Sequence, residues 1–267
     1  MLGIVYGIWT SLLDYNLHRP ESIKFVGLAN YYELLLSPTF QKVILTTIIF
    51  TGASVGLIFL IGVTLALITY RFVRFGRVIR TILFLPYVLP PVVVGLIFRT
   101  FMFNPNPSIG YVNYFLSLMG VKGPEWLGTG SMSLLSVILV EVWQMTPFCY
   151  LLTLAGLFAI PSEIIDASLI DGAGWVRSAI HIILPILKPT LASMLILRTS
   201  FTLASFDRIY IITRGGPGIA TTTIPIQAYR SLFLYLDAGQ ASCMAIILAL
   251  IALLFTVLYY KFLYQMR

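Results

Sequence analysis

Five stretches of this chain are each about as long and as apolar as a helix that crosses a lipid bilayer. A transmembrane helix needs about 20 consecutive, mostly apolar residues. The composition, with 59% hydrophobic and 10% charged residues, excludes an ordinary soluble domain. We therefore expect an all-α integral membrane protein with a single transmembrane domain over residues 1–267. The five stretches cover residues 43–70, 79–103, 132–157, 186–207 and 239–262.

A shorter apolar stretch opens the chain at residues 1–13. It has neither the basic n-region nor the small-residue cleavage site of a secretory signal peptide. It is too short to cross a bilayer unaided, so we interpret it as part of a span. The sequence thus predicts six transmembrane helices, with five as the alternative.

Basic residues indicate which face of the protein is cytoplasmic. Arg71, Arg74, Arg77 and Arg80 lie in the short segment between the first two long stretches. Cytoplasmic loops concentrate Lys and Arg near the ends of spans, so this segment is predicted to lie inside. The net charge of +7 is spread over the chain rather than gathered in one patch, so we expect no nucleic-acid binding.

Counting spans from that basic segment assigns sides to the other loops. It places residues 158–185 and the C-terminus in the cytoplasm. It places residues 14–41, 104–131 and 208–238 outside, where Tyr111 and Trp126 are aromatic candidates for contact with a partner.

The segment 158–185 interrupts the apolar sequence with polar residues. Glu163 and Asp166 fall in the first turn of a predicted helix, where carboxylates meet the positive end of the helix dipole. Gly172 is expected to break that helix. A second helix is predicted to end at Pro185, because the residue before proline disfavours helical angles. We expect a cytoplasmic helix–turn–helix between the fourth and fifth spans, with a plain surface loop as the alternative.

The spacing in this segment resembles the coupling loop of binding-protein-dependent ABC importer permeases. The family pattern is Glu-Ala-Ala, three residues, Gly, nine residues, Ile, one residue, Leu-Pro. This chain has Asp166-Ala167-Ser168, Gly172, Ile182 and Leu184-Pro185, which agree at five of the seven positions. The resemblance implies that the loop docks on a separate ATPase subunit. The implied ATPase-coupling residues are Glu163, Asp166, Ala167, Ser168, Asp171 and Gly172.

A second segment resembles one class within that family. Residues 212–217 read Ile-Thr-Arg-Gly-Gly-Pro and are followed by three threonines and Tyr229. This pattern resembles the Gly-Gly-Pro-containing subunit of the maltose and glycerol-phosphate class of type I carbohydrate importers, and residues 25–31 and 80–96 resemble it too. Since Gly-Gly-Pro makes a tight turn in any protein, a plain turn between spans is the alternative.

The resemblance implies a set of partners and a location. This permease is expected to pair with a second, non-identical permease, two ATPase subunits and an extracytoplasmic solute-binding protein, and to carry a carbohydrate. It is expected to be a multi-pass protein of a bacterial cytoplasmic (inner) membrane.

Two charged residues lie near the middle of predicted spans, where ionisable groups are costly and usually functional. Glu141 lies about nine residues into the fourth span, and Arg198 lies about nine residues beyond Pro189 in the fifth. At 1.5 Å per residue, both positions approach the centre of the bilayer. A pocket that holds a solute is one interpretation, and a buried structural Glu–Arg pair is the other.

Polar and aromatic residues extend these two positions into a candidate substrate path. Helical spacing places polar side chains on the same faces as the two charges, and nearby aromatic rings suit the C–H face of a sugar. The candidate residues are Glu141, Trp143, Gln144, Phe148, Tyr150, Arg198, Thr202 and Ser205.

The third predicted span contains Pro86, Pro90 and Pro91 near its middle. Each proline removes a backbone donor and bends the helix, so we expect a hinge or a span that lines a pathway, with a packing kink as the alternative. In the second span, Gly52 and Gly56 form a Gly-x-x-x-Gly motif, which we expect to serve internal helix packing.

Several kinds of site are absent from the sequence. There is no Gly-x-x-x-x-Gly-Lys-Ser/Thr motif, so the chain is not expected to be an ATPase or to bind a cofactor itself. ATP and Mg are expected on the partner ATPase subunits. No metal-ligand spacing is found. A gradient-driven secondary transporter and a membrane anchor for another complex are the alternative functions, although the first usually shows an internal repeat of broken helices.

Overall fold

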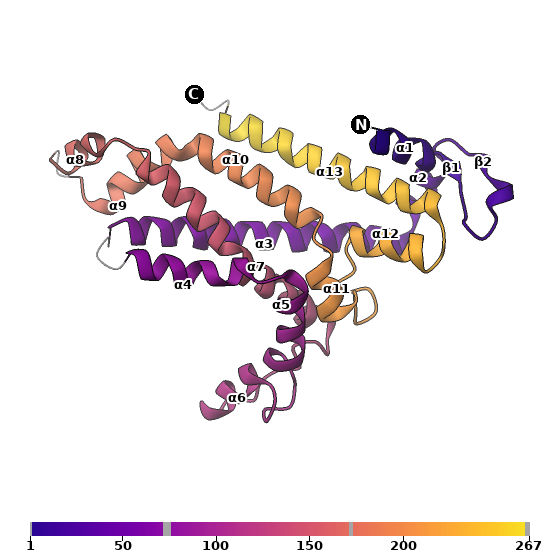
Figure 1. Ribbon diagram of the computed structural model, residues 1–267, viewed down its shortest axis with the longest axis horizontal. Helices are drawn as coiled ribbons and strands as arrows, with labels where there is room; N and C mark the ends of the chain where they lie inside the picture. Colours follow the sequence, from indigo (N-terminus) through magenta and orange to yellow (C-terminus); the bar gives the residue numbers. More distant parts are fainter. Residues whose placement is uncertain (1, 72–75, 171–172, 265–267) are drawn as a thin grey trace. The chain divides into compact units, whose positions relative to one another are not determined.

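The computed structural model describes residues 2–71, 76–170 and 173–264, and this part of the chain is built mainly of helices (Figure 1). The N-terminal elements are α1 (Leu2–Ser11), β1 (Leu13–Asp14), a 3-10 turn (Pro20–Ser22), β2 (Lys24–Phe25) and α2 (Ala29–Leu36). The middle elements are α3 (Pro38–Arg71), α4 (Gly76–Val88), α5 (Pro91–Ile97), a π-helical turn (Phe98–Met102), α6 (Tyr111–Leu118) and α7 (Gly130–Phe158). The remaining elements are α8 (Ser162–Ile170), α9 (Trp175–Ser178), a second π-helical turn (Ala179–Ile183), α10 (Leu184–Leu203), α11 (Asp207–Thr213), α12 (Ile224–Phe233) and α13 (Ala238–Tyr264).

Within the described residues, four helices are long and apolar enough to cross a membrane. A fifth candidate is a broken one, because its two pieces pass the same test only together. The predicted helical membrane fold is therefore confirmed, with four or five candidate spans among the described residues, whereas the predicted count of six is not confirmed. The ten-residue α1 is not among them, since it rises only about 15 Å against a bilayer core of about 30 Å. The four long spans are Pro38–Arg71, Gly130–Phe158, Trp175–Leu203 and Ala238–Lys261, and the broken one is Arg80–Val88 with Pro91–Met102.

The chain divides into two compact units, and the four long helices are each shared between them. The first unit comprises residues 1–52, 91–140 and 201–254, and the second comprises residues 53–90, 141–200 and 255–267.

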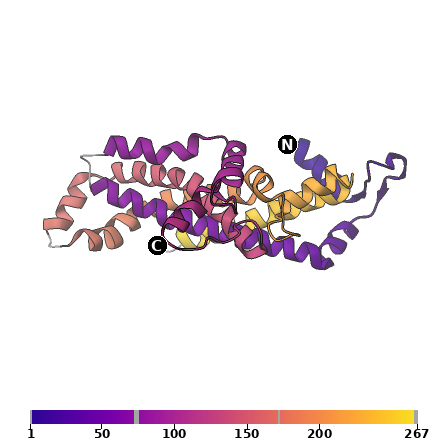
Figure 2. The ribbon, with the colours of Figure 1, turned by 90° about the horizontal axis from the view of Figure 1, so that it is seen from below.

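In the first unit, the N-terminal segment lies beside the start of α13 in both views (Figures 1 and 2). The backbone N–H of Leu17 donates to the carbonyl of Leu236, and that of Gly239 donates to the carbonyl of Tyr15. The buried Asn30 amide donates to the carbonyls of Ser11 and Leu13, each at 2.9 Å. These bonds hold the short two-stranded β1–β2 sheet in place although none of its four side chains is buried.

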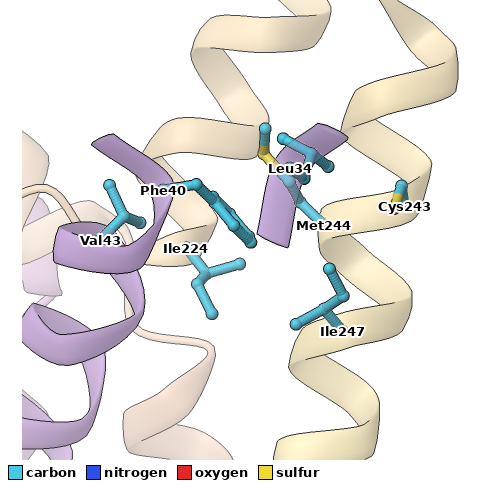
Figure 3. Packing of buried hydrophobic residues seen from close by; sticks show 7 residues of the cluster. All are labelled: Leu34, Phe40, Val43, Ile224, Cys243, Met244 and Ile247. Atoms are coloured by element: carbon cyan, nitrogen blue, oxygen red, sulfur yellow. The ribbon is translucent and has the colours of Figure 1, made fainter. Parts of the chain in front are cut away.

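A buried apolar cluster joins four helices of the first unit (Figure 3). Side chains from α2, α3 and α12 face those of α13, and all are at most 8% exposed. Burying apolar surface in this way stabilises the contact between helices that are far apart in sequence. The members of this cluster are Leu34, Phe40, Val43, Ile224, Cys243, Met244 and Ile247.

In the second unit, α3 and α7 approach closely. A Cβ added at Gly62 would stand 2.6 Å from the sulfur of Cys149, so only glycine allows this contact. The hydroxyl of Thr69 donates to that of Tyr150 at 3.2 Å. At Gly52 and Gly56 an added Cβ would meet nothing within 4 Å, so the expectation that this motif serves internal packing is wrong.

The third predicted span is broken rather than merely bent. Pro86 stays inside α4, whereas Pro90 lies in the break and Pro91 begins α5. Proline is favoured at the first position of a helix, because the N–H that it lacks has no helical partner there.

The prediction that Pro185 ends a helix is wrong. Leu184 has helical angles (φ −61°, ψ −40°), and the helix continues from Trp175 to Leu203. The π-helical turn just before Pro185 explains this, because its wider hydrogen-bond spacing accommodates a ring that cannot donate.

Candidate functional site

The two charges predicted near the middle of the membrane form an ion pair in the second unit. Nη2 of Arg198 on α10 donates to Oε1 of Glu141 on α7. The two residues are 4% and 1% exposed. This contact is the buried Glu–Arg pair of the second interpretation, whereas the solute pocket of the first stays a prediction.

Two further residues of the predicted path lie on α7 beside Glu141. The buried Gln144 amide donates at 2.8 Å to the carbonyl of Leu89, which lies in the break that follows α4. Phe148 stacks on Tyr87 of α4, with ring centroids 5.8 Å apart. The face of α7 that carries Glu141 thus holds the end of α4 in place.

Two of the predicted aromatic residues, Trp143 and Tyr150, line a pocket of about 410 Å³ between α3, α4 and α7. Trp143 is 43% exposed there, and Tyr150 is fully buried. Pro86 lines the same pocket, and so does Pro147, a proline inside α7 that the sequence reasoning did not single out. A proline interrupts the backbone hydrogen-bond ladder of its helix, so two of the three helices around this pocket, α4 and α7, are interrupted.

Thr202 and Ser205, the last two predicted path residues, belong to the first unit, where both are buried. The Ser205 hydroxyl accepts a hydrogen bond from Arg208 at 3.2 Å. Charged residues near span ends commonly extend to the membrane surface. Arg208 does not, because it is only 8% exposed.

The predicted coupling segment forms two helices, α8 and α9, which lie next to each other in both views (Figures 1 and 2). Glu163 and Ala167 are exposed on α8. Ser168 is buried, and its hydroxyl bonds to that of Ser178 in the second helix at 2.9 Å. The backbone of Asp166 lies in α8. Two predicted residues, Asp171 and Gly172, lie outside the described residues.

The coupling helices also expose apolar side chains. Ile170 is 85% exposed and Val176 is 68% exposed. Exposed apolar residues next to a carboxylate-bearing face are typical of a surface that another protein covers.

The Gly-Gly-Pro segment forms the predicted turn, between α11 and α12. Gly215 adopts φ +86°, which side-chain-bearing residues rarely do. Arg230 donates to the carbonyl of Arg214 at 2.7 Å and to the hydroxyl of Thr222 at 3.3 Å. Arg230 thus joins the end of the turn to the start of the threonine segment.

Among the described residues, no group of three or more His, Cys, Asp and Glu side chains is placed to hold a metal ion. Cys149 and Cys243 are buried and are not joined in a disulfide.

The sequence matches the family described as binding-protein-dependent transport system inner membrane component over residues 58–266. It is 38% identical over 261 residues to the trehalose/maltose transport system permease protein MalF of Thermococcus litoralis, a match that covers 98% of this chain and 87% of that protein. It is 31% identical over 271 residues to the sn-glycerol-3-phosphate transport system permease protein UgpA of Pectobacterium atrosepticum, covering 98% and 90% of the two chains.

The fold is similar to that of a chain in the crystal structure of a bacterial ABC transporter involved in the import of the acidic polysaccharide alginate. The TM-score is 0.82 at 23% sequence identity, and the alignment covers 97% of this chain and 88% of the other.

Proposed function

This chain belongs to the family of binding-protein-dependent transport system inner membrane components and is the permease component of such an importer, and we propose that it carries a carbohydrate or a carbohydrate-like solute into the cytoplasm. The observation that carries the proposal is the 38% sequence identity to a trehalose/maltose permease, in an alignment that covers 98% of the chain. The relative that carries glycerol phosphate extends the proposed cargo to polar, polyol-like molecules.

The proposed path for the solute is formed by polar residues of α7 and α10. Glu141 and Arg198 supply a buried carboxylate and a buried guanidinium, which bind hydroxyl and carboxyl groups well. Trp143 and Tyr150 supply aromatic surface, and Gln144 and Phe148 position the end of α4. Thr202 and Ser205, which are buried in the first unit, are proposed as further polar contacts for the solute. The guanidinium favours a cargo with some negative charge.

The proposed site of energy input is the pair α8 and α9. The sequence has no motif for cradling ATP phosphates, so the energy has to come from other subunits. We assign two ATPase subunits to the complex, one of which binds α8 through Glu163, Asp166 and Ala167. ATP-driven movement of α8 would then shift the spans between two arrangements, with Pro86, Pro90 and Pro91 as the hinge.

The remaining partners follow from the same assignment. A second, non-identical permease completes the pathway, and an extracytoplasmic binding protein delivers the solute to the outer segments. The protein is proposed to lie in a cytoplasmic membrane, with residues 158–185 and the C-terminus inside. Arg71 and Arg80, which flank the loop after α3, support this orientation because basic residues are enriched in cytoplasmic loops.

Reconstitution tests this function directly. The chain is co-expressed with its permease and ATPase partners, placed in proteoliposomes and supplied with the solute-binding protein and radiolabelled trehalose, maltose or glycerol 3-phosphate. Uptake of at least one of these solutes is expected, and only with ATP and the binding protein together. Uptake that is driven by a proton or sodium gradient through this chain alone would contradict the proposal.

A further inference from the structure

Five side chains from four helices of the second unit meet where α3 and α7 end and α9 begins. Three are aromatic and two are arginines. None of them belongs to the predicted coupling motif or to the proposed solute path. We call Tyr70, Arg71, Arg80, Phe158 and Trp175 the ring cluster.

Tyr70, near the end of α3, lies at the centre of the ring cluster. Its ring stacks on Trp175, the first residue of α9, at 6.2 Å between centroids and 14° between planes. It also contacts Phe158, the last residue of α7, at 5.4 Å. The guanidinium of Arg71 lies 5.6 Å from the ring centre of Trp175, and that of Arg80 on α4 lies 5.0 Å from that of Phe158.

The two coupling helices are joined to each other by a separate contact. The hydroxyls of Ser168 on α8 and Ser178 on α9 bond to each other, and both residues are at most 4% exposed. The backbone N–H of Ala173 also donates to the carbonyl of Ser168. A force on α8 therefore reaches α9.

From α9 the force has two routes into the spans. One is along the chain, through the π-helical turn and Pro185 into α10. The other is sideways, from Trp175 through the ring cluster into α3, α4 and α7. π-helical turns inside helices are frequent at functional sites. Since the route along the chain leads only into α10, movement reaches α3, α4 and α7 by the sideways route.

Ring contacts suit a joint that moves. Aromatic pairs remain favourable over centroid distances of about 4.5–7 Å, and a cation is attracted to a ring within about 6 Å. Such contacts keep their attraction when one helix shifts slightly past another, whereas a single directional hydrogen bond would break.

We propose that the ring cluster transmits the movement of α8 and α9 to α3, α4 and α7, which makes Tyr70 and Trp175 positioning residues for energy coupling. The inference rests on the proposed function, because it needs an ATPase partner that moves α8. It goes further by naming residues outside the coupling motif through which ATP hydrolysis is converted into solute movement.

The test measures solute uptake per ATP hydrolysed in proteoliposomes that contain the complete complex. Tyr70→Leu and Trp175→Leu are each expected to lower this ratio about threefold to tenfold, the change that corresponds to losing one aromatic pair. The ATPase subunits should still co-purify, because α8 is unchanged. The double variant Tyr70→Leu/Trp175→Leu should have a ratio no lower than that of the single variant with the lower ratio, because both substitutions break the same contact. Trp175→Phe should keep most of the wild-type ratio, because it keeps a ring at this position.

Tyr6→Leu is the matched control, since Tyr6 is 63% exposed on α1, lies outside the ring cluster and the outer segments, and should leave the ratio unchanged. Wild-type ratios in both leucine variants would overturn the inference while leaving the proposed function intact. If the wild-type complex shows no ATP-dependent uptake, the proposed function fails instead. Should a leucine variant not assemble, the double variant Arg71→Gln/Arg80→Gln, which keeps all three rings, decides. A lowered ratio there supports the inference, and a wild-type ratio overturns it.

Discussion

Arg198 of α10 donates a hydrogen bond to Glu141 of α7, and this ion pair is almost completely shielded from solvent. The two residues are 57 positions apart in the sequence. Removing charges from water is costly, so a buried pair is weak grounds for stability by itself, whereas removing one partner is strongly destabilising. This asymmetry allows the structural and the transport roles of the pair to be separated.

We predict that Arg198→Met alone destabilises the complex by about 3–5 kcal/mol, because the buried Glu141 carboxylate loses its guanidinium. Glu141→Gln together with Arg198→Met removes both charges and should restore assembly and thermal stability. Uptake by this double variant should nevertheless stay at least tenfold below wild type, because the charged groups of the path are gone. Wild-type uptake would show that the pair only joins the two helices.

The contact between Gln144 and the end of α4 is expected to be needed for stability. Gln144→Leu removes the donor to the half-buried carbonyl of Leu89, and losing a typical hydrogen bond costs about 0.5–1.5 kcal/mol. Thermal unfolding of the purified complex measures this loss. Ser193→Ala is the control, because the Ser193 hydroxyl bonds within its own helix and is exposed. Equal stability of the two variants would contradict the prediction.

Gly62 sets the distance between α3 and α7 in the second unit. Gly62→Ala should destabilise the complex by about 1–3 kcal/mol, because the added methyl group overlaps Cys149. Cys149→Gly in the same chain should recover part of that loss. At Gly56, where an added Cβ meets nothing, alanine should be neutral or slightly stabilising, since it favours a helix by up to about 1 kcal/mol. Thermal unfolding of the three variants compares these effects.

Asp237, which precedes the span of α13, gives a dependence on pH. Its carboxylate accepts a hydrogen bond from the backbone N–H of Gln240 at 2.8 Å, but burial raises its pKa. A raised pKa in the folded state means that the protonated form is favoured on folding. This contribution to stability is present below the ordinary pKa of 3.8 and is lost as the pH rises through the folded value.

Asp237→Asn keeps an acceptor for Gln240 and removes the charge. We therefore expect the variant to be at least as stable as wild type at neutral pH, with the difference shrinking towards pH 4. Unfolding midpoints measured across that range test this, and a variant that is less stable at neutral pH would argue against it.

The positions of the long helices could be predicted from the sequence because apolar length is a strong signal. The predicted span at 132–157 corresponds to Gly130–Phe158, and the one at 239–262 corresponds to Ala238–Tyr264. The pair of Glu141 and Arg198 could also be found, because charges inside apolar spans stand out.

Other features depend on contacts that no local pattern reveals. Pro185 does not end its helix, because the π-helical turn before it supplies the necessary space. The burial of Arg208 follows from packing in the first unit and not from its place near the end of a span. The ring cluster brings together residues from four helices, so only the folded chain shows that Tyr70 and Trp175 meet.

The central claim is that α8 is the surface on which an ATPase subunit docks, and site-directed crosslinking tests it most directly. Cysteine is introduced at Ala167 or Ile170, both exposed on α8, and a bifunctional thiol reagent is applied to the assembled complex in membranes. Tyr32→Cys serves as the control, because Tyr32 lies in a segment predicted to be outside. We predict a crosslinked product with an ATPase subunit for the two α8 positions, with a yield that changes when ATP is added. Capture of the extracytoplasmic binding protein instead, or no protein product from either α8 position, would contradict it.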